Sequence, residues 1–187
     1  MIKENIKGYE LLFETNADCF SPKYIDRGTL AMLSFVDFKE DDKILDLGCG
    51  YGVVGVLAAK VTNPKNVFMT DVKNSIVEIS KANAKLNNVA DVNIIKSNAY
   101  ESLDEAGFNV ILSNPPYHTD FSIAKTFIEK GFNRLLLGGK FYMVTKRRQW
   151  YKNKFISIFG GVIIHEKDGY YIFEAEKRDY KYSNIKR

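Results

Sequence analysis

The sequence predicts an α/β fold, a doubly wound, seven-stranded and mostly parallel sheet that ends in an antiparallel C-terminal hairpin. Short runs rich in Val, Ile and Phe alternate with segments of helical period, which is typical of a parallel sheet covered on both faces. The first of the runs assigned as sheet strands leads directly into a glycine-rich loop that opens an apolar helix. The last two runs are separated only by Lys167-Asp168-Gly169, and Asp-Gly between apolar runs predicts a tight turn.

Each predicted strand is a short apolar run, and predicted helices fill most of the gaps between them. Asn74 has the side chain of an N-cap for a helix that ends at Asn87-Asn88. Another helix is predicted from about Asp120 to Leu137, where the glycine pair Gly138-Gly139 stops it. The predicted strands are residues 43–47, 66–71, 92–96, 108–113, 140–145, 161–166 and 170–174.

Length and composition predict one domain. With 187 residues, 45% of them hydrophobic, the chain can bury a single core, and no shift in composition marks a second domain. We expect one domain over residues 1–187. Residues 1–40 form an N-terminal extension that packs on it, and residues 178–187 form a flexible tail.

Composition also bounds the cellular setting. No stretch approaches the roughly 20 consecutive apolar residues that cross a bilayer, and the first ten residues lack the apolar core of a signal peptide. Cys19 and Cys49 are too few for a zinc cluster or a disulfide framework, which fits a reducing compartment. We therefore expect a cytoplasmic protein without membrane contact or metal, either a monomer or a homodimer.

Positive charge gathers toward the C-terminus. The net charge is +4, and residues 140–187 hold 12 Lys and Arg against 5 Asp and Glu. Such an excess favours a polyanionic partner, because each phosphate that is neutralised releases counterions. A solvated face explains the same excess equally well.

The loop after the first predicted strand, DLGCGYG at residues 46–52, predicts a Rossmann-like cofactor site. Glycines permit positive φ and remove the Cβ atoms that keep a ligand from the backbone. Asp71 closes the second predicted strand, where a carboxylate accepts hydrogen bonds from both hydroxyls of a ribose. Asn98 is placed to bond an adenine edge, although a plain turn asparagine explains it as well. The residues assigned to the cofactor here are Asp46, Gly48, Cys49, Gly50, Asp71, Val72, Asn98 and Ala99.

Two cofactors fit a glycine loop that is followed by an acidic residue. One is the nicotinamide dinucleotide of an oxidoreductase, and the other is S-adenosyl-L-methionine. Asp46 stands ahead of the first glycine, where its carboxylate attracts the cationic amino-acid end of S-adenosyl-L-methionine and would repel a pyrophosphate. The sequence therefore favours S-adenosyl-L-methionine.

The fourth predicted strand ends in Asn114-Pro115-Pro116-Tyr117, which predicts a site for a planar exocyclic amine. Two prolines fix φ and remove two backbone donors, so the carbonyls of Asn114 and Pro115 can point outward. The lone pair of an amine conjugated to a ring is delocalised. The Asn114 side-chain oxygen and the Pro115 carbonyl can hold its two hydrogens and stabilise the charge that develops. Tyr117 can stack on the ring, with Pro116 beside it, and His118 either touches the substrate or is simply exposed.

The motifs DLGCGYG and NPPYH, together with Asp71, resemble class I methyltransferases. They are most similar to the small-methyltransferase domain of the ribosomal RNA small-subunit methyltransferase C family, which modifies the exocyclic amine of guanine. The segment CFSPKYIDRGTLAML is similar to the segment that precedes the first strand in that family, and the resemblance covers nearly the whole chain. It implies that Asp46, Gly48, Gly50 and Asp71 hold the cofactor, that Asn114, Pro115 and Tyr117 hold the target, and that Phe20, Asp26 and Thr29 line the cofactor side or fix a helix start.

The long members of that family carry an extra N-terminal domain that this sequence lacks. Substrate recognition would then come from the one domain, from a dimer, or from the basic C-terminal segment. A run of cations in that segment suits phosphate contact, and a solvated helix face explains it almost as well. These residues are Lys146, Arg147, Arg148, Lys152 and Lys154.

Asn-Pro-Pro-Tyr chemistry serves guanine amines, adenine amines and the side-chain amide of glutamine. The glutamine enzymes have a helical domain before the glycine loop, whereas some 40 residues precede it here. DNA adenine enzymes usually add a target-recognition region, and no such insertion is visible in this sequence. RNA is therefore favoured, with guanine N2 of ribosomal RNA first and adenine N6 second. An NAD-binding oxidoreductase and a non-catalytic RNA-binding protein remain as alternatives from other classes.

Overall fold

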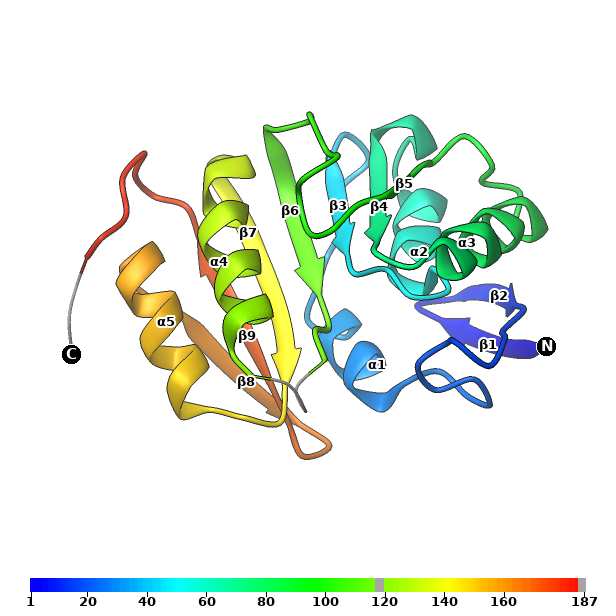
Figure 1. The fold of residues 1–187 in the computed structure, drawn as a ribbon, viewed down its shortest axis with the longest axis horizontal. Helices are drawn as coiled ribbons and strands as arrows, with labels where there is room; N and C mark the ends of the chain where they lie inside the picture. Colours follow the sequence, from blue (N-terminus) through cyan, green and yellow to red (C-terminus); the bar gives the residue numbers. More distant parts are fainter. Residues whose placement is uncertain (117–119, 185–187) are drawn as a thin grey trace.

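The computed structural model describes residues 1–116 and 120–184 (Figure 1). Its centre is a seven-stranded sheet in the spatial order β5-β4-β3-β6-β7-β9-β8. The five neighbouring strands β5, β4, β3, β6 and β7 pair in parallel, and β9 pairs antiparallel with both β7 and β8. The predicted doubly wound fold with its antiparallel hairpin is confirmed. The strands are β3 (Ile44–Leu47), β4 (Val67–Asp71), β5 (Asn93–Lys96), β6 (Phe108–Ser113), β7 (Leu135–Thr145), β8 (Ile163–Lys167) and β9 (Tyr170–Glu176).

Helices cover both faces of the sheet, and each face buries its own core. The first three helices pack on one face around side chains such as Val56 and Leu112, and the last two pack on the other around Phe141 and Phe155. None of the helices within residues 1–116 and 120–184 has both the length and the apolar character that crossing a membrane requires. The helices are α1 (Arg27–Leu33), α2 (Val53–Val61), α3 (Asn74–Leu86), α4 (Ser122–Arg134) and α5 (Gln149–Phe159), with a 3-10 turn at Pro64–Asn66.

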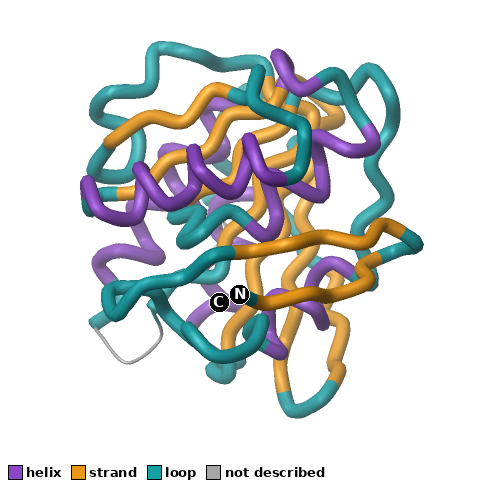
Figure 2. Tube along the Cα trace, turned by 90° about the vertical axis from the view of Figure 1, so that its right-hand side faces the viewer, coloured by secondary structure: helices purple, strands orange, loops and turns teal. Residues whose placement is uncertain are grey.

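An N-terminal hairpin, β1 (Ile2–Ile6) and β2 (Tyr9–Phe13), forms a second, separate sheet that was not among the predicted elements. It lies alongside α3 (Figure 2). Asn87, the C-cap residue of α3, accepts from the Leu12 amide at 3.0 Å and donates to the Leu12 carbonyl at 2.7 Å. Asn83 of α3 bonds to the Glu14 backbone in the same way, so two buried asparagines provide hydrogen-bond partners for the backbone of β2 and of the residue that follows it.

Three local predictions were wrong. The N-cap of α3 is Lys73, and Asn74 is its first helical residue. The helix predicted to reach Leu137 ends at Arg134, because residues 135–137 already belong to β7. Gly138-Gly139 lies within that strand, where the Gly138 amide donates to the Lys177 carbonyl at 2.7 Å. A Cβ on Gly139 would lie 2.7 Å from the Phe108 carbonyl oxygen, so the glycine serves close strand packing.

The described part of the predicted tail contacts the α4–α5 layer. The Tyr182 ring packs edge-on against Phe132 with centroids 5.1 Å apart, and its hydroxyl donates to the Glu129 carbonyl at 2.9 Å. The amide of Ser183 donates to the Ile158 carbonyl at 3.1 Å. These contacts hold residues 182–183 against the end of α5.

Candidate active site

A cavity of about 430 Å³ opens at the carboxyl ends of the parallel strands. It lies where the strand order reverses, between β3 and its two neighbours β4 and β6, which is where ligands bind in doubly wound sheets. Its volume is in the range of small-molecule sites. Every residue assigned to the cofactor from the sequence lines it, and so do Phe20, Asn114, Pro115 and Pro116.

The glycine loop between β3 and α2 forms one wall of this cavity. Gly48, Gly50 and Gly52 have φ of +73°, +55° and +100°, values that other residues rarely adopt. The amides of Gly48 and Cys49 both donate to the Thr70 carbonyl, at 2.9 and 2.8 Å, and so anchor the loop on β4. A Cβ on Gly50 would meet nothing within 4 Å, so at that position the glycine is required for backbone conformation rather than for space.

Asp46 is a buried carboxylate at the end of β3, with 3% of its surface exposed. It accepts a hydrogen bond of 2.9 Å from the Gly55 amide in the first turn of α2. Burial raises the pKa of Asp46 to about 7; the Gly55 bond lowers it, and the nearby carboxylate of Asp71 raises it further. A cation in the cavity would stabilise the ionised form of Asp46.

Asp71, at the end of β4, is held by two backbone amides. It accepts from Gly50 at 3.2 Å and from Lys73 at 3.1 Å, one on each carboxylate oxygen. Each oxygen keeps a further lone pair, so the group can accept from a diol in the cavity. Val72 lies beside it with 56% of its surface exposed. Together they form the cavity edge above β4.

Two further predicted residues, Asn98 and Ala99, form the part of the wall that follows β5. The Asn98 amide nitrogen donates to Glu101 at 3.0 Å, which fixes how the side chain is turned. Ala99 adopts a φ of +51°. Cys49, across the cavity, is buried, and burial holds the pKa of its thiol well above the usual range, so the side chain is neutral packing rather than a nucleophile.

The Asn-Pro-Pro corner follows β6, and its asparagine is clamped from α1. The Asn114 amide nitrogen donates to Asp26 at 2.8 Å and to the Thr29 hydroxyl at 3.0 Å. The same Asp26 oxygen caps α1 by accepting from the Thr29 amide at 2.9 Å. Both hydrogens of the Asn114 amide are therefore used. No described residue donates to its side-chain oxygen, which remains available as an acceptor.

The structure therefore gives Asp26 and Thr29 a contact that the sequence does not reveal. Both line the cavity, as the family resemblance implies, but their side chains bond to Asn114 and cap α1. Other lining residues were not assigned to the site from the sequence, because the features that bring them to the cavity are tertiary contacts. Among them are Asp18, Ile25, Tyr51, Ile76 and Phe127.

The basic run Lys146, Arg147 and Arg148 lies outside the cavity, in the loop between β7 and α5. Because β6 and β7 are parallel, this loop emerges from the same sheet edge as the Asn-Pro-Pro corner. The Arg147 guanidinium lies 5.2 Å from the centroid of the Phe121 ring, which orients it. The predicted roles of Tyr117 and His118 fall outside the described residues.

A doubly wound sheet whose glycine loop, acidic β4 terminus and Asn-Pro-Pro corner meet at one cavity defines the Rossmann-like class of methyltransferases. The sequence matches the methyltransferase small domain family over residues 10–174. The chain belongs to this family and is an S-adenosyl-L-methionine-dependent methyltransferase.

Proteins with similar sequences include an uncharacterized protein and named methyltransferases. The chain is 30% identical to the uncharacterized protein YbxB of Bacillus subtilis, over 92% of this chain and 89% of that one. It is 32% identical to the ribosomal RNA small subunit methyltransferase C of Hamiltonella defensa, over 72% of this chain and 41% of that one. The chain thus spans less than half the length of the named methyltransferases of this kind, such as those of Hamiltonella and Psychromonas.

Solved structures show the same fold. The 16S rRNA N2 G1207 methyltransferase of T. thermophilus, solved with AdoMet and guanosine, superposes with a TM-score of 0.86 at 25% identity, over 95% of this chain and 50% of that one. A methyltransferase from Pyrococcus furiosus superposes with a TM-score of 0.72 at 20% identity, over 90% of both chains, and shows the shared fold.

Proposed function

We propose that this methyltransferase acts on an exocyclic amine of a base in RNA, with guanine N2 of ribosomal RNA as the target. The observation that carries this proposal is the pair of hydrogen bonds that the Asn114 amide donates to Asp26 and Thr29, here called the clamp. Because Asp26 and Thr29 take both amide hydrogens, Asn114 can present only an acceptor to a substrate. An acceptor at this corner suits an NH2 group and does not suit a carbonyl or a phosphate.

The cavity also fits the proposed cofactor. Asp46 is a buried carboxylate that forms no ion pair with a described cation, so the cationic amino-acid end of S-adenosyl-L-methionine would relieve the cost of its burial. Asp71 retains lone pairs for the two ribose hydroxyls, and Gly48 and Gly50 leave the backbone open. We assign the remaining wall to the same ligand, with Cys49, Val72, Asn98, Ala99 and Thr29 lining it. When bound, the cofactor supplies an electrophilic methyl group.

The chain's own contribution to the reaction is orientation and charge stabilisation. The Asn114 side-chain oxygen and the Pro115 carbonyl oxygen each accept one hydrogen of the amine, which aims the nitrogen lone pair into the cavity. As the nitrogen becomes positive, both bonds strengthen, so the two acceptors stabilise the transition state more than the bound substrate. Holding Asn114 from α1 prevents its amide from turning its hydrogens toward the substrate.

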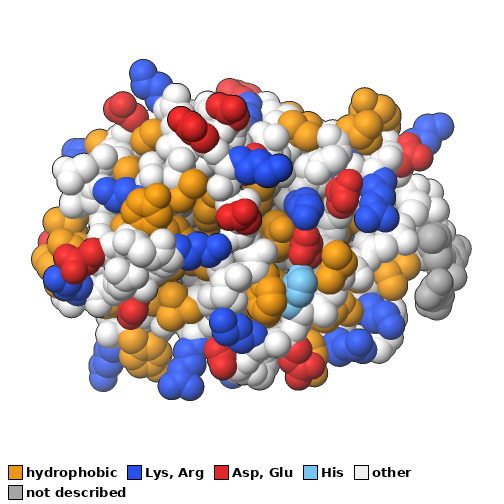
Figure 3. All heavy atoms as spheres, turned by 180° about the vertical axis from the view of Figure 1, so that it is seen from behind, with side chains coloured by type: hydrophobic (Ala, Val, Ile, Leu, Met, Phe, Trp, Pro, Cys, Tyr) orange, Lys and Arg blue, Asp and Glu red, His pale blue; other side chains and the backbone are white. Residues whose placement is uncertain are grey.

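RNA as the substrate is supported by the surroundings of the cavity. Figure 3 shows cationic and anionic side chains interspersed on the back of the molecule. By contrast, Lys146, Arg147 and Arg148 are consecutive exposed cations at the sheet edge that carries the site. We assign them to phosphates, and Phe20 and Pro116 to the target base, with Tyr117 and His118 beside it. The structural similarity to the T. thermophilus N2 methyltransferase of 16S rRNA supports guanine as the target.

The test measures transfer of tritium from S-[methyl-³H]adenosylmethionine to deproteinised ribosomal RNA and, in a separate reaction, to total cellular protein. The labelled RNA is then analysed by mass spectrometry of its nucleosides. We expect label in N2-methylguanosine. Asn114→Ala should abolish transfer and leave the affinity for S-adenosyl-L-methionine, measured by calorimetry, nearly unchanged. Label in N6-methyladenosine would replace guanine by adenine, label in a protein glutamine would refute the RNA assignment, and full activity in Asn114→Ala would refute the role of the clamp.

A further inference from the structure

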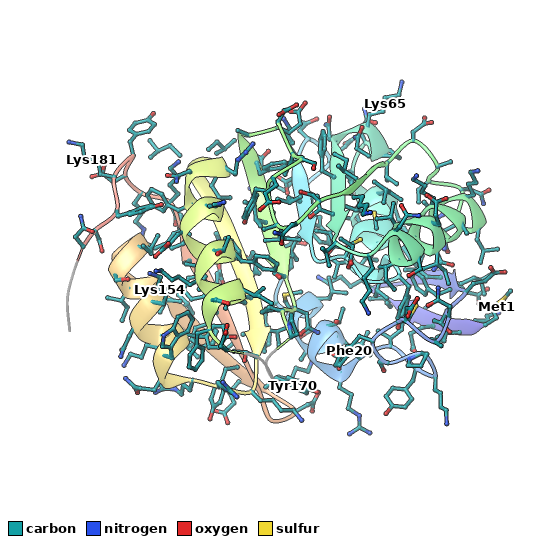
Figure 4. The ribbon with its side chains drawn as sticks, in the orientation of Figure 1. Met1, Phe20, Lys65, Lys154, Tyr170 and Lys181 are labelled. Carbon is teal, nitrogen blue, oxygen red and sulfur yellow. The ribbon has the colours of Figure 1, made fainter. Side chains whose placement is uncertain are left out.

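A second hollow, of about 760 Å³, adjoins the cofactor cavity on its α1 side. It lies between the loop that precedes α1, the first turns of α1 and the start of β9. Figure 4 shows Phe20 and Tyr170 close to α1. The hollow is lined by Phe20, Ser21, Tyr24, Ile25, Asp26, Arg27, Leu30 and Tyr170.

The two hollows share a wall. Phe20, Ile25 and Asp26 line both, so the second hollow lies next to the side of the cavity where Asn114 is clamped. A polymer whose target base sits at Asn114 must continue over the surface beside the cavity. The second hollow is part of that surface, and Asp26, which accepts from Asn114, lines both hollows.

The chemistry of the second hollow is aromatic and cationic. Phe20 is 57% exposed and Tyr24 is 65% exposed, unusually high for large rings that could have been buried. Arg27 is exposed at the first position of α1, and no described carboxylate forms an ion pair with it. The acidic member, Asp26, accepts bonds from Asn114 and Thr29 instead. Exposed ring faces beside a cation are the features with which proteins bind single-stranded nucleic acid.

The rings are presented by a structured loop. The Ser21 hydroxyl donates to the Tyr24 carbonyl at 2.7 Å, and the Thr15 hydroxyl donates to the Pro22 carbonyl at 2.7 Å. Ser21 itself has a φ of +56°, a conformation that costs energy in a residue other than glycine. The loop is thus held in shape by hydrogen bonds from side-chain hydroxyls to its backbone carbonyls, and the Tyr24 ring contributes little to that shape because most of it faces solvent.

The side of the hollow where α1 meets β9 is also closely packed. Gly28 lies in the first turn of α1, and a Cβ there would come within 2.7 Å of the Tyr170 ring. The glycine therefore lets the ring approach the helix. The Lys146 ammonium lies 5.0 Å from the centroid of the same ring, so the basic loop borders the hollow on this side.

We propose that the second hollow holds the nucleotide next to the target base in single-stranded RNA, with its base stacked on Tyr24 and Phe20 and its phosphate paired with Arg27. This inference rests on the proposed function, because the target base must occupy the first cavity. The inference adds a subsite that holds the strand beside the target base. It also predicts that the substrate is unpaired RNA rather than a duplex.

The test measures binding of a fluorescein-labelled single-stranded RNA of nine nucleotides by anisotropy, with the full chain and saturating S-adenosylhomocysteine. Tyr24→Leu removes the ring and keeps an apolar side chain, and Tyr24→Phe keeps the ring. We expect Tyr24→Leu to weaken binding by about 5- to 100-fold and Tyr24→Phe by less than about threefold, because stacking needs a ring face. Arg27→Gln should also lower the salt dependence, by roughly 0.7 in the slope of log K against log salt.

Matched controls come from the other end of the molecule, where Lys181 lies far from Phe20 (Figure 4). Tyr180 is 76% exposed there, so Tyr180→Leu and Lys181→Gln remove an exposed tyrosine ring and a cation from a surface outside the hollow. They should bind RNA like the parent. If Tyr24→Leu binds as tightly as the parent, or if Tyr24→Phe is as weak as Tyr24→Leu, stacking in the second hollow is refuted.

Methyl transfer measured on the same oligonucleotide and on ribosomal RNA separates this inference from the proposed function. Transfer to RNA with an unaffected Tyr24→Leu variant overturns the subsite and leaves the function standing. Loss of RNA binding in Tyr24→Leu without any transfer by the parent supports the subsite and overturns the function. A duplex that binds as well as the single strand and does not depend on Tyr24 would overturn the subsite.

Discussion

Asp46 provides the sharpest test of the electrostatics of the site. Its pKa is raised from the ordinary 3.8 to about 7, chiefly by burial, a shift of about 3 units or about 4 kcal/mol. Between these two values the folded protein keeps a proton that the unfolded chain has lost. The contribution of Asp46 to stability is therefore complete below pH 3.8 and is lost as the pH rises to about 7.

Asp46→Asn should remove this dependence. Asparagine stays neutral, and its oxygen can still accept from the Gly55 amide, which lies 2.9 Å from the carboxylate of Asp46. From pH 5 to pH 8 the free energy of unfolding of the parent should fall relative to Asp46→Asn by about 3 kcal/mol, because about two of the pH units lie below the pKa of Asp46. Urea unfolding of both proteins, without cofactor, measures the difference. An equal difference at pH 5 and pH 8 would refute the assigned ionisation.

The same carboxylate should couple cofactor binding to protons. A cationic ligand favours ionised Asp46, so binding below pH 7 should release up to one proton, and affinity should rise up to about tenfold per pH unit toward pH 7. Calorimetry in two buffers of different ionisation enthalpy counts the proton. S-adenosylhomocysteine retains the amino-acid end and should show the same proton release and the same pH dependence of affinity. Adenosine, which lacks that end, should show neither. Affinity that is independent of pH from 5 to 7 would place the cationic end elsewhere.

The remaining predictions concern the diol acceptor, the clamp and the packing beneath the glycine loop. Asp71→Ala should weaken S-adenosyl-L-methionine binding by roughly 10- to 100-fold, because about 1.5–3 kcal/mol of charged hydrogen bonding is lost; unaltered affinity by calorimetry would contradict the ribose assignment. Asp26→Ala should lower kcat by more than about tenfold at nearly constant cofactor affinity, whereas Asp26→Asn, which keeps an acceptor for Asn114, should retain most of the activity; equal kcat in the two variants would show that the clamp does not orient the amide. Gly55→Ala should lower the free energy of unfolding, measured by urea denaturation, by about 1–3 kcal/mol, because the added Cβ would lie 2.5 Å from the Met69 side chain in β4. Gly161→Ala, whose Cβ would meet nothing within 4 Å, is the control, and a similar loss in both would rule out the clash.

The class of the central sheet, mostly parallel with a terminal antiparallel hairpin, followed from local pattern alone. The apolar runs, the glycine loop at residues 46–52 and the Asp168-Gly169 turn carry their signals within a few neighbouring residues. Because strands of a doubly wound sheet place their carboxyl ends at one edge, the same pattern predicted that Asp46, Asp71 and Asn114 would meet. Their positions around one cavity agree with that expectation.

Errors arose where a distant segment outweighed the local signal. The glycine pair at 138–139 is typical of a helix end, but Leu135 pairs with Phe108 of β6 and the glycines bond to the Lys177 backbone, so β7 begins at Leu135. The β1–β2 hairpin has weak apolar alternation of its own, and Asn83 and Asn87, some 70 residues away, complete its hydrogen bonding.

For this protein, the order of residues alone determined the fold class, the glycine loop and the stiff corner after β6, because those features depend on backbone preferences and apolar period over short spans. Tertiary structure alone decided how the corner is used. The bonds from Asn114 to Asp26 and Thr29 join residues 88 and 85 positions apart, and the two hollows share walls because α1 packs on β7 and β9, next to the corner that follows β6. Contacts of that range depend on where the chain returns in space, which short sequence patterns do not contain.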